Sequence, residues 1–250
     1  MRLLTGIIVC ACALSAQADL THRYRFEGNA LDSAETLDGV VFGATFQSGV
    51  VGQGMLLDGV NDYVDLGSLA VTTNTFTIAT WANMYGPAGG SQPSNTLFSQ
   101  RDDNTKSSGI NLSPGSTTSP TFPSSTATAF IRDNNNQILR ADSTFQGYGT
   151  WHHYAMTLDN SELKLYVDGQ LQTTIANTLT GNLFHSIDHV VIGKQTWRGV
   201  DQMFFNGMID ELRIYDTALD ASEIAALAVP EPATLLLLGV GGLVVRRRPR

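Results

Sequence analysis

Carboxylate and amide side chains at two places in the sequence could hold a metal ion. One place is Asp103 with Asn104, and the other combines Glu27 or Asp32 near the start of the chain with Asp210 near its end. Calcium prefers hard oxygen ligands of this kind. Neither place matches an EF-hand loop, because the required glycine and closing glutamate are missing. Calcium is therefore the cofactor that these residues permit, although Asp103 and Asn104 could instead cap a solvated loop.

Aromatic side chains at the rim of a loop could contact a sugar. Trp197 and Arg198 lie together in the stretch GKQTWRGVDQ and are the best candidates for ligand binding. An aromatic ring supplies a flat apolar face, and a guanidinium supplies planar hydrogen-bond donors. Weaker candidates are Tyr85, Tyr148 and Phe122. Trp81 and Trp151 lie in strand-like alternation instead, so we predict that both belong to the core.

The histidines offer little metal chemistry. His152 and His153 are adjacent, and neighbouring residues of a strand point to opposite faces, so they cannot share one ion. We expect His153 to be packed and hydrogen-bonded. His185 and His189 lie beside turn-like residues, and we do not expect them to bind metal either.

The acidic residues do not have the arrangement of a hydrolase. Glycoside hydrolysis needs two carboxylates across the scissile bond, whereas Asp210 and Glu211 are neighbours that a strand would point apart. A Gly-x-Ser-x-Gly nucleophile elbow is also missing from the sequence. We therefore predict that the protein is not an enzyme, and a glycoside hydrolase with an unrecognised acid pair is the alternative.

Residues 1–18 have the composition of a secretory signal peptide. Arg2 precedes an apolar run, and Ala16-Gln17-Ala18 has the A-x-A pattern of a cleavage site. Both cysteines, Cys10 and Cys12, lie inside this segment, so the mature chain would have no disulfide. We expect an exported protein.

The other end of the chain has three parts in order. Pro230-Glu231-Pro232 precedes an apolar run, Ala233–Val245, which is followed by Arg246, Arg247 and Arg248. The apolar run is shorter than the roughly twenty residues that cross a bilayer as a helix. This tail resembles the PEP-CTERM sorting signal of bacterial exported proteins. The resemblance implies transient membrane anchoring, processing by an exosortase, and location at the cell surface or in the extracellular matrix; an ordinary C-terminal anchor is the alternative.

Charge excludes one class of partner for the body between these segments, residues 19–229. Of the 15 Lys and Arg residues five lie in the terminal segments, and of the 23 Asp and Glu residues one does. The body therefore has 10 basic and 22 acidic residues, a net charge near −12. Because nucleic-acid phosphates would repel such a body, we expect no nucleic-acid partner.

The elements that must position these side chains are mostly strands. Short alternating stretches such as Phe76–Trp81 and Glu162–Val167 have period two and are rich in β-branched and aromatic residues. Asp168-Gly169 between two such runs predicts a hairpin turn. One helix is expected at 221–228, with Asp220 and Glu223 as a capping box. Residues 86–126 are rich in Gly, Ser, Thr and Pro, and we predict loops there around short strands.

Five stretches in order resemble the laminin-G-like branch of the concanavalin A-like proteins. They are YRFEGN, GMLLDG with DYV, FTIATW, WHHYA with LYVDG, and FNGMIDELRIY, and they extend over nearly the whole body. The resemblance implies an all-β jelly-roll sandwich of two antiparallel sheets with one short C-terminal helix, and binding roles more often than catalysis. Laminarinase-type relatives have a Glu-x-Asp-x-Glu strand, which this sequence lacks.

The stretch Phe98–Asn104 resembles the calcium-binding stretch of pentraxin-like relatives. The partner acids of those relatives would fall near residues 191–197, where this sequence has no carboxylate. We therefore predict an exported, non-catalytic module that recognises a polysaccharide, a surface glycan or a protein. A structural matrix protein without a specific ligand is the alternative. The sequence leaves the ligand, the oligomeric state and the glycosylation of loops open.

Overall fold

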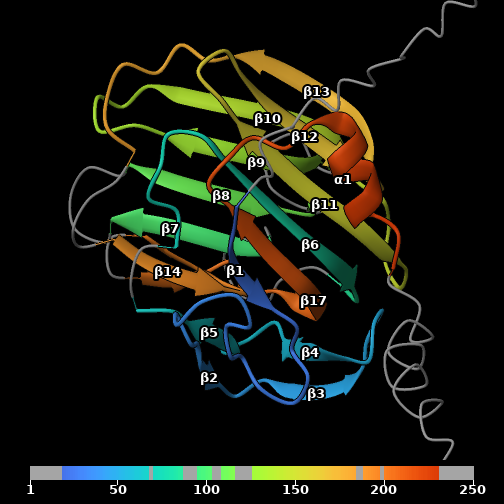
Figure 1. Cartoon of the computed structure of the whole chain (residues 1–250). Coiled ribbons are helices and arrows are strands. Elements are labelled where there is room, and N and C mark those ends of the chain that lie inside the picture. Colours follow the sequence, from blue (N-terminus) through green and yellow to red (C-terminus); the bar gives the residue numbers. More distant parts are fainter. Residues whose placement is uncertain are drawn as a thin grey trace, which may run out of the picture.

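The computed structural model describes residues 19–67, 70–86, 95–102, 108–115, 126–183, 188–197 and 200–230. Two antiparallel sheets pack face to face, and the single helix of the described chain, α1, lies on the outside of one of them (Figure 1). The prediction of an all-β sandwich with one short C-terminal helix is confirmed. Among the described residues, no helix is long and apolar enough to cross a bilayer.

The first sheet, called sheet A, is the one that α1 covers. Its strands run in the order β13-β12-β11-β6-β17-β4-β3, and β1 also pairs with β17. The bounds are β1 Leu20–Tyr24, β3 Thr45–Ser48, β4 Gln53–Asp58, β6 Phe76–Met84, β11 Trp151–Leu158, β12 Glu162–Val167, β13 Gln170–Ala176 and β17 Asn206–Tyr215. Strands from both ends of the chain therefore meet beside each other in sheet A.

The second sheet, called sheet B, has the order β10-β9-β8-β7-β14-β5-β2. The bounds are β2 Val40–Phe42, β5 Tyr63–Asp65, β7 Phe98–Asp102, β8 Gly109–Ser113, β9 Thr126–Arg132, β10 Ile138–Thr144 and β14 Asp188–Ile192. A separate two-stranded hairpin consists of β15, Gln195–Trp197, and β16, Val200–Gln202. All five positions of β8 are buried, whereas β9 and β10 alternate between buried and less buried positions.

Side chains that point inward from alternate positions of the strands fill the space between the two sheets. Strand β9 alternates strictly between buried and half-buried positions, with Ala127, Ala129 and Ile131 in the core. Strand β6 is buried at every position, because its inner side chains face sheet B and others face outward under α1. The predicted half-buried strand at Glu162–Val167 is found as β12, with Leu163, Leu165 and Val167 buried, whereas the prediction for Phe76–Trp81 misses the second cover over β6.

Helix α1 spans Ala221–Leu227 and begins with the expected cap. The Asp220 side chain accepts hydrogen bonds from the backbone of Ser222 and Glu223, and the Glu223 side chain accepts one from the backbone of Asp220. Ile224 is buried against sheet A, in a small cluster with Leu219, Tyr166, Ala79 and Ala155. This second core fixes the helix on the outer face of sheet A.

The hairpin between β12 and β13 also has the expected turn. Asp168 and Gly169 both have positive φ, 50° and 74°, which a tight two-residue turn requires. The Asp168 carboxylate accepts the backbone N–H of His153 at 2.9 Å and bonds to His152 Nδ1 at 2.8 Å. The turn is therefore tied to β11, the neighbouring strand.

His153 follows its prediction only in part. The side chain is buried and its ring meets the Trp81 ring edge-on, with centroids 5.4 Å apart. Its Nδ1 atom, however, has no hydrogen-bond partner. Burial lowers the pKa of His153 to about 4, so the ring is neutral at physiological pH. His153 is thus packed as predicted, and its backbone N–H is hydrogen-bonded to Asp168 while its Nδ1 atom is not hydrogen-bonded.

Candidate functional site

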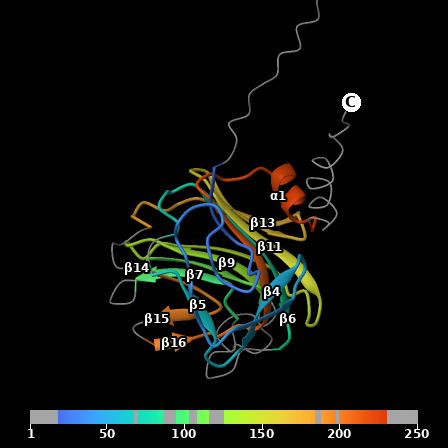
Figure 2. The same ribbon diagram turned by 60° about the horizontal axis from the view of Figure 1, so that its bottom comes forward.

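The hairpin β15–β16 crosses the outer face of sheet B. Asn111 of β8 donates a hydrogen bond from Nδ2 to Gln195 Oε1 at 3.2 Å, and β15 also contacts β7. Figure 2 shows β15 and β16 beside β5 and β7. The hairpin therefore lies over the middle strands of sheet B and leaves a flank of the sheet on each side.

Lys194 anchors the base of the hairpin. Its Nζ atom lies 3.6 Å from the centroid of the Tyr63 ring on β5 and 2.6 Å from Asp201 Oδ2 on β16. Asp201 also accepts a hydrogen bond from Thr196 at 2.7 Å. An ammonium over an aromatic face is attracted by the ring quadrupole, more strongly when it is desolvated. Lys194 is only 5% exposed, so this contact fixes the hairpin on sheet B.

On the flank formed by β8, β9 and β10, Phe130 lies half-buried on the outer face. It pairs across the sheet with Asn111 on one side and Arg140 on the other. The guanidinium carbons of Arg101 and Arg132 lie 5.9 Å and 5.7 Å from the centroid of its ring. An aromatic ring flanked by planar hydrogen-bond donors is the combination that the sequence analysis sought at Trp197 and Arg198.

A glycine makes this arrangement possible. Arg101 crosses β8 at Gly109, where a Cβ atom would lie only 2.8 Å from Arg101 Cγ. Burial, together with the smaller effect of the neighbouring charge of Arg132, lowers the pKa of Arg101 to about 10. Arg101 therefore stays charged at neutral pH while it lies over the sheet. The sequence gives only a weak sign of this aromatic–arginine cluster, because the sign consists of one glycine paired with one arginine on the neighbouring strand.

The structure places the predicted ligand-binding residues only in part. Trp197 is the last residue of β15, on the hairpin beside this flank, while Arg198 lies outside the described residues. Tyr85 and Tyr148 are exposed, and Tyr148 packs on Phe145. Trp81 is buried as predicted, whereas Trp151 is only half-buried. Positions 122 and 185 lie outside the described residues as well.

The predicted metal ligands separate into different places. Glu27 and Asp210 both reach the turn between β3 and β4: Glu27 accepts the Gln53 N–H at 3.1 Å, and Asp210 accepts those of Val50 and Val51 at 2.9 Å and 3.0 Å. Asp32 does not join them, because its carboxylate bonds to His22 and to backbone N–H groups near its own loop. A shared ion between Asp32 and Asp210 stays a prediction.

Asp210 is fully buried, and its surroundings are those of a turn anchor. Its second oxygen accepts the Glu211 N–H at 2.8 Å, so backbone donors occupy both oxygens. Burial raises the pKa of Asp210 to about 7. Within the described ranges no three His, Cys, Asp or Glu side chains gather as a metal site. Asp103 and Asn104 lie outside those ranges, so calcium there stays a prediction.

Asp210 and Glu211 are neighbours in the sequence but bind different partners. Glu211 is 3% exposed and accepts from Arg23 at 2.7 Å and Arg213 at 2.9 Å, with Arg25 at 3.4 Å. Its φ of 50° marks an irregularity in β17 between Asp210 and Arg213. This residue joins β1 to β17, a role that the sequence analysis missed.

Pro230, the first residue of the predicted sorting signal, is exposed and follows α1 almost directly. Glu231, Pro232 and Arg246–Arg248 lie outside the described residues. Residues 228–250 match the PEP-CTERM protein-sorting motif, as the tail predicted. The motif indicates an exported protein.

Solved structures resemble the fold at low sequence identity. Domain 4 of a GH43 extracellular arabinanase from Geobacillus stearothermophilus, in complex with arabinotriose, has a TM-score of 0.68 at 22% identity, over 85% of this chain and 99% of that one. The binding domain of Paraclostridial Mosquitocidal Protein 1 has a TM-score of 0.63 at 15% identity, over 84% and 51%. A Ruminococcus gnavus sialidase CBM40 bound to α2,3 sialyllactose has 0.52 at 16%, over 63% and 84%. These likenesses show the fold alone.

No curated protein matches the sequence. Residues 58–225 match the family described as the Concanavalin A-like lectin/glucanases superfamily. That match spans more than half of the chain and includes strands of both sheets as well as the start of α1. The protein therefore belongs to the concanavalin A-like lectin/glucanase superfamily and has a PEP-CTERM motif at its C-terminus.

Proposed function

We propose that this protein is an exported, non-catalytic module that recognises glycans at the bacterial surface or in the exopolysaccharide matrix. The observation that carries the proposal is the Phe130 flank of sheet B, where two guanidiniums lie over a half-buried ring beside the hairpin that carries Trp197. Sugar rings stack on aromatic faces, and planar donors bind their oxygens. Two structural neighbours were solved with bound saccharides, which makes arabinan and sialylated glycans suitable first probes.

A glycan array tests the proposal directly. The mature body, residues 19–229, is compared with its Phe130→Ala and Trp197→Ala variants, with and without EDTA. We expect both substitutions to lower glycan binding at least tenfold while the melting temperature stays within a few degrees. Leu171→Ala, which removes an exposed apolar side chain from β13 of sheet A, is the control. A body that binds no glycan would support the alternative, a structural matrix protein without a specific ligand.

The tail gives the proposed location. In the proposal, an exosortase-type enzyme processes the PEP-CTERM motif after transient membrane anchoring, and the domain then remains at the surface or in the matrix. The support is the motif match at residues 228–250 together with the signal-peptide pattern of residues 1–18. Fractionation of the native host, with detection of the mature mass, tests this step. A full-length form stably embedded in the membrane would contradict the processing.

A further inference from the structure

On the other flank of the hairpin, two aromatic rings are stacked at the edge of sheet B. Phe42 of β2 pairs with Tyr63 of β5, and their rings are nearly parallel, 10° apart, with centroids separated by 4.6 Å. Strand β2 is the end of the sheet, and Phe42 is 41% exposed. The stacked aromatic pair therefore lies at the surface and is not part of the hydrophobic core.

Side chains of β2 alternate between the core and the solvent, and Phe42 is on the solvent side. Val41 packs against the core, while Val40 and Phe42 point away from it, and Val40 is 60% exposed. Edge strands that face water usually carry charged side chains instead. Grouped apolar exposure of this kind, unlike a single exposed residue, marks a contact surface.

Charged side chains beside the stacked rings determine which kind of ligand the rings could bind. Lys194 lies over Tyr63 and bonds to Asp201, whose side chain is 43% exposed. Asp65 follows Tyr63 on the same face of β5. Burial raises the pKa of Tyr63, and the negative charges of Asp201 and Asp65 act in the same direction. Carboxylates accept hydrogen bonds from sugar hydroxyls, and they would repel a negatively charged sugar.

We propose that Phe42 and Tyr63, with Asp65 and Asp201, form a second saccharide-binding site that takes neutral polysaccharide. Five strand spacings separate β9 from β2, which at about 4.8 Å each place the two sites about 24 Å apart. The hairpin lies between them. Each site therefore contacts its own stretch of polysaccharide, and the domain is bivalent. This inference rests on the proposed saccharide binding by sheet B.

An array of neutral and acidic polysaccharides tests the second site. Four proteins are compared on it: the wild-type body, Phe42→Ala, Phe130→Ala and the double variant. Because two linked contacts raise avidity far above either affinity, we expect Phe42→Ala to weaken binding to neutral polysaccharides about tenfold or more. The double variant should lose binding, and each single variant should halve the stoichiometry for short oligosaccharides. Phe42→Tyr keeps the aromatic ring and should bind polysaccharide as the wild type does. This result would show that the loss in Phe42→Ala comes from the missing ring and not from substitution at this position.

Leu31→Ala is the matched control, because it removes an apolar side chain that is 54% exposed in a different loop. If Phe42→Ala binds as Leu31→Ala does, the second site is wrong while the proposed function stands. Binding of acidic polysaccharides alone would also overturn the second site. If the wild-type body binds none of the polysaccharides, the proposed function fails together with it.

Discussion

At the scale of single residues, three of the acidic side chains that suggested calcium, Glu27, Asp32 and Asp210, accept hydrogen bonds from backbone N–H groups. Asp210 holds the turn between β3 and β4, and Asp32 holds its own loop. Asp133, which was not among the predicted site residues, has the same role. Its carboxylate accepts hydrogen bonds from the backbone N–H groups of Gln137 and Gly181, both at 2.8 Å, and so joins two loops. Buried backbone donors require partners, and aspartate supplies them in this fold.

Asp210 makes stability depend on pH. Its pKa of about 7 lies above the usual value near 3.9, so its contribution to the free energy of unfolding is complete below pH 4 and is lost as the pH rises to about 7. We expect the unfolding free energy of the wild type to fall over this range relative to Asp210→Asn, by at most about 4 kcal/mol. Urea titrations at pH 4, 5.5 and 7.5 measure the difference. Parallel pH profiles for the two proteins would show that Asp210 does not titrate in this range.

Calcium is tested on the same pair of proteins. An ion bound by Asp210 would favour its charged form, so millimolar calcium should raise the melting temperature of the wild type at pH 7.5 but not that of Asp210→Asn. Asp103→Ala should abolish the rise instead if the ion binds at Asp103 and Asn104. A melting temperature independent of calcium in the wild type would contradict both sites.

At the scale of elements, the helix and the hairpin are each fixed by a few polar contacts. The capping box of α1 was readable because Asp220 and Glu223 stand three residues apart before an apolar turn. The hairpin β15–β16 was expected only as a loop, since its three-residue strands are too short to show alternation. Its anchor, Lys194 on Tyr63, joins residues far apart in the sequence, and no local pattern announces such a contact.

Loss of the helix cap should destabilise the domain modestly. We expect Asp220→Ala to lower the free energy of unfolding by about 1 kcal/mol, because the first backbone N–H groups of α1 lose their acceptor. Chemical denaturation measures the change. Glu35→Ala, which removes an exposed carboxylate in the loop before β2, should leave stability unchanged. Equal losses in both variants would contradict a specific capping effect.

Lys194 offers a test of the hairpin as an element. We expect Lys194→Gln to weaken glycan binding severalfold, because the hairpin loses both the ammonium–Tyr63 contact and the ion pair with Asp201. Lys164→Gln, which removes a lysine paired with Glu162 on β12, is the control and should bind normally. Unchanged binding by Lys194→Gln would show that the hairpin does not position the site.

At the scale of the whole molecule, the order of motifs along the chain was sufficient to predict the sandwich. Period-two stretches such as Phe76–Trp81 and the Asp168-Gly169 turn indicated strands and their local pairing. The pairing of β1 with β17, and the crossing of sheet B by the hairpin, required the folded chain. The candidate site at Phe130, Arg101 and Arg132 could not be read from the sequence, because these residues come together through three neighbouring strands, β7, β8 and β9.

Removal of the tail should leave the domain intact. We expect a chain that ends at Val229 to be released into the medium in folded form, because the described contacts of sheet A and α1 do not require residues beyond Pro230. Its far-ultraviolet circular dichroism should show well under a fifth helix. Retention of the truncated protein in the membrane fraction would contradict the role of the tail.

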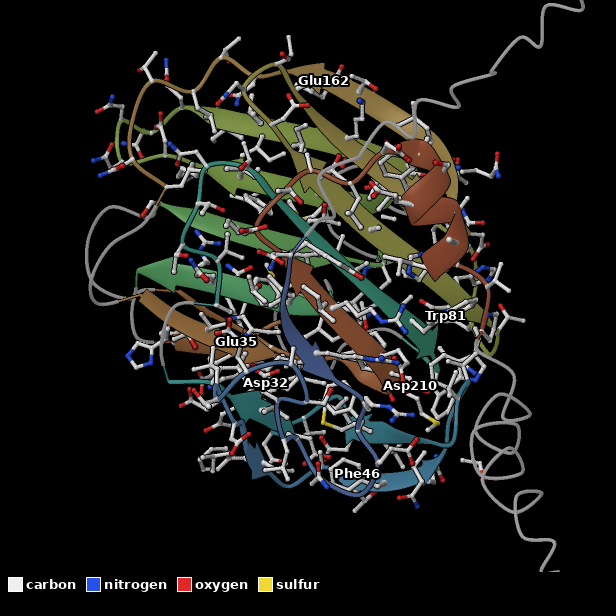
Figure 3. All side chains as sticks on the ribbon, in the orientation of Figure 1. Asp32, Glu35, Phe46, Trp81, Glu162 and Asp210 are labelled. Atoms are coloured by element: carbon white, nitrogen blue, oxygen red, sulfur yellow. The ribbon has the colours of Figure 1, made fainter. Side chains whose placement is uncertain are left out.

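The position of α1 has a consequence for orientation. The helix lies on the outer face of sheet A (Figures 1 and 3). In the sequence, the matched sorting motif begins at residue 228, directly after the last residue of the helix, Leu227. Both aromatic flanks lie on the opposite side of the sandwich, on sheet B. In the proposed anchored state the attachment point would lie at the end of α1, so the thickness of the sandwich would separate it from the Phe130 and Phe42 flanks.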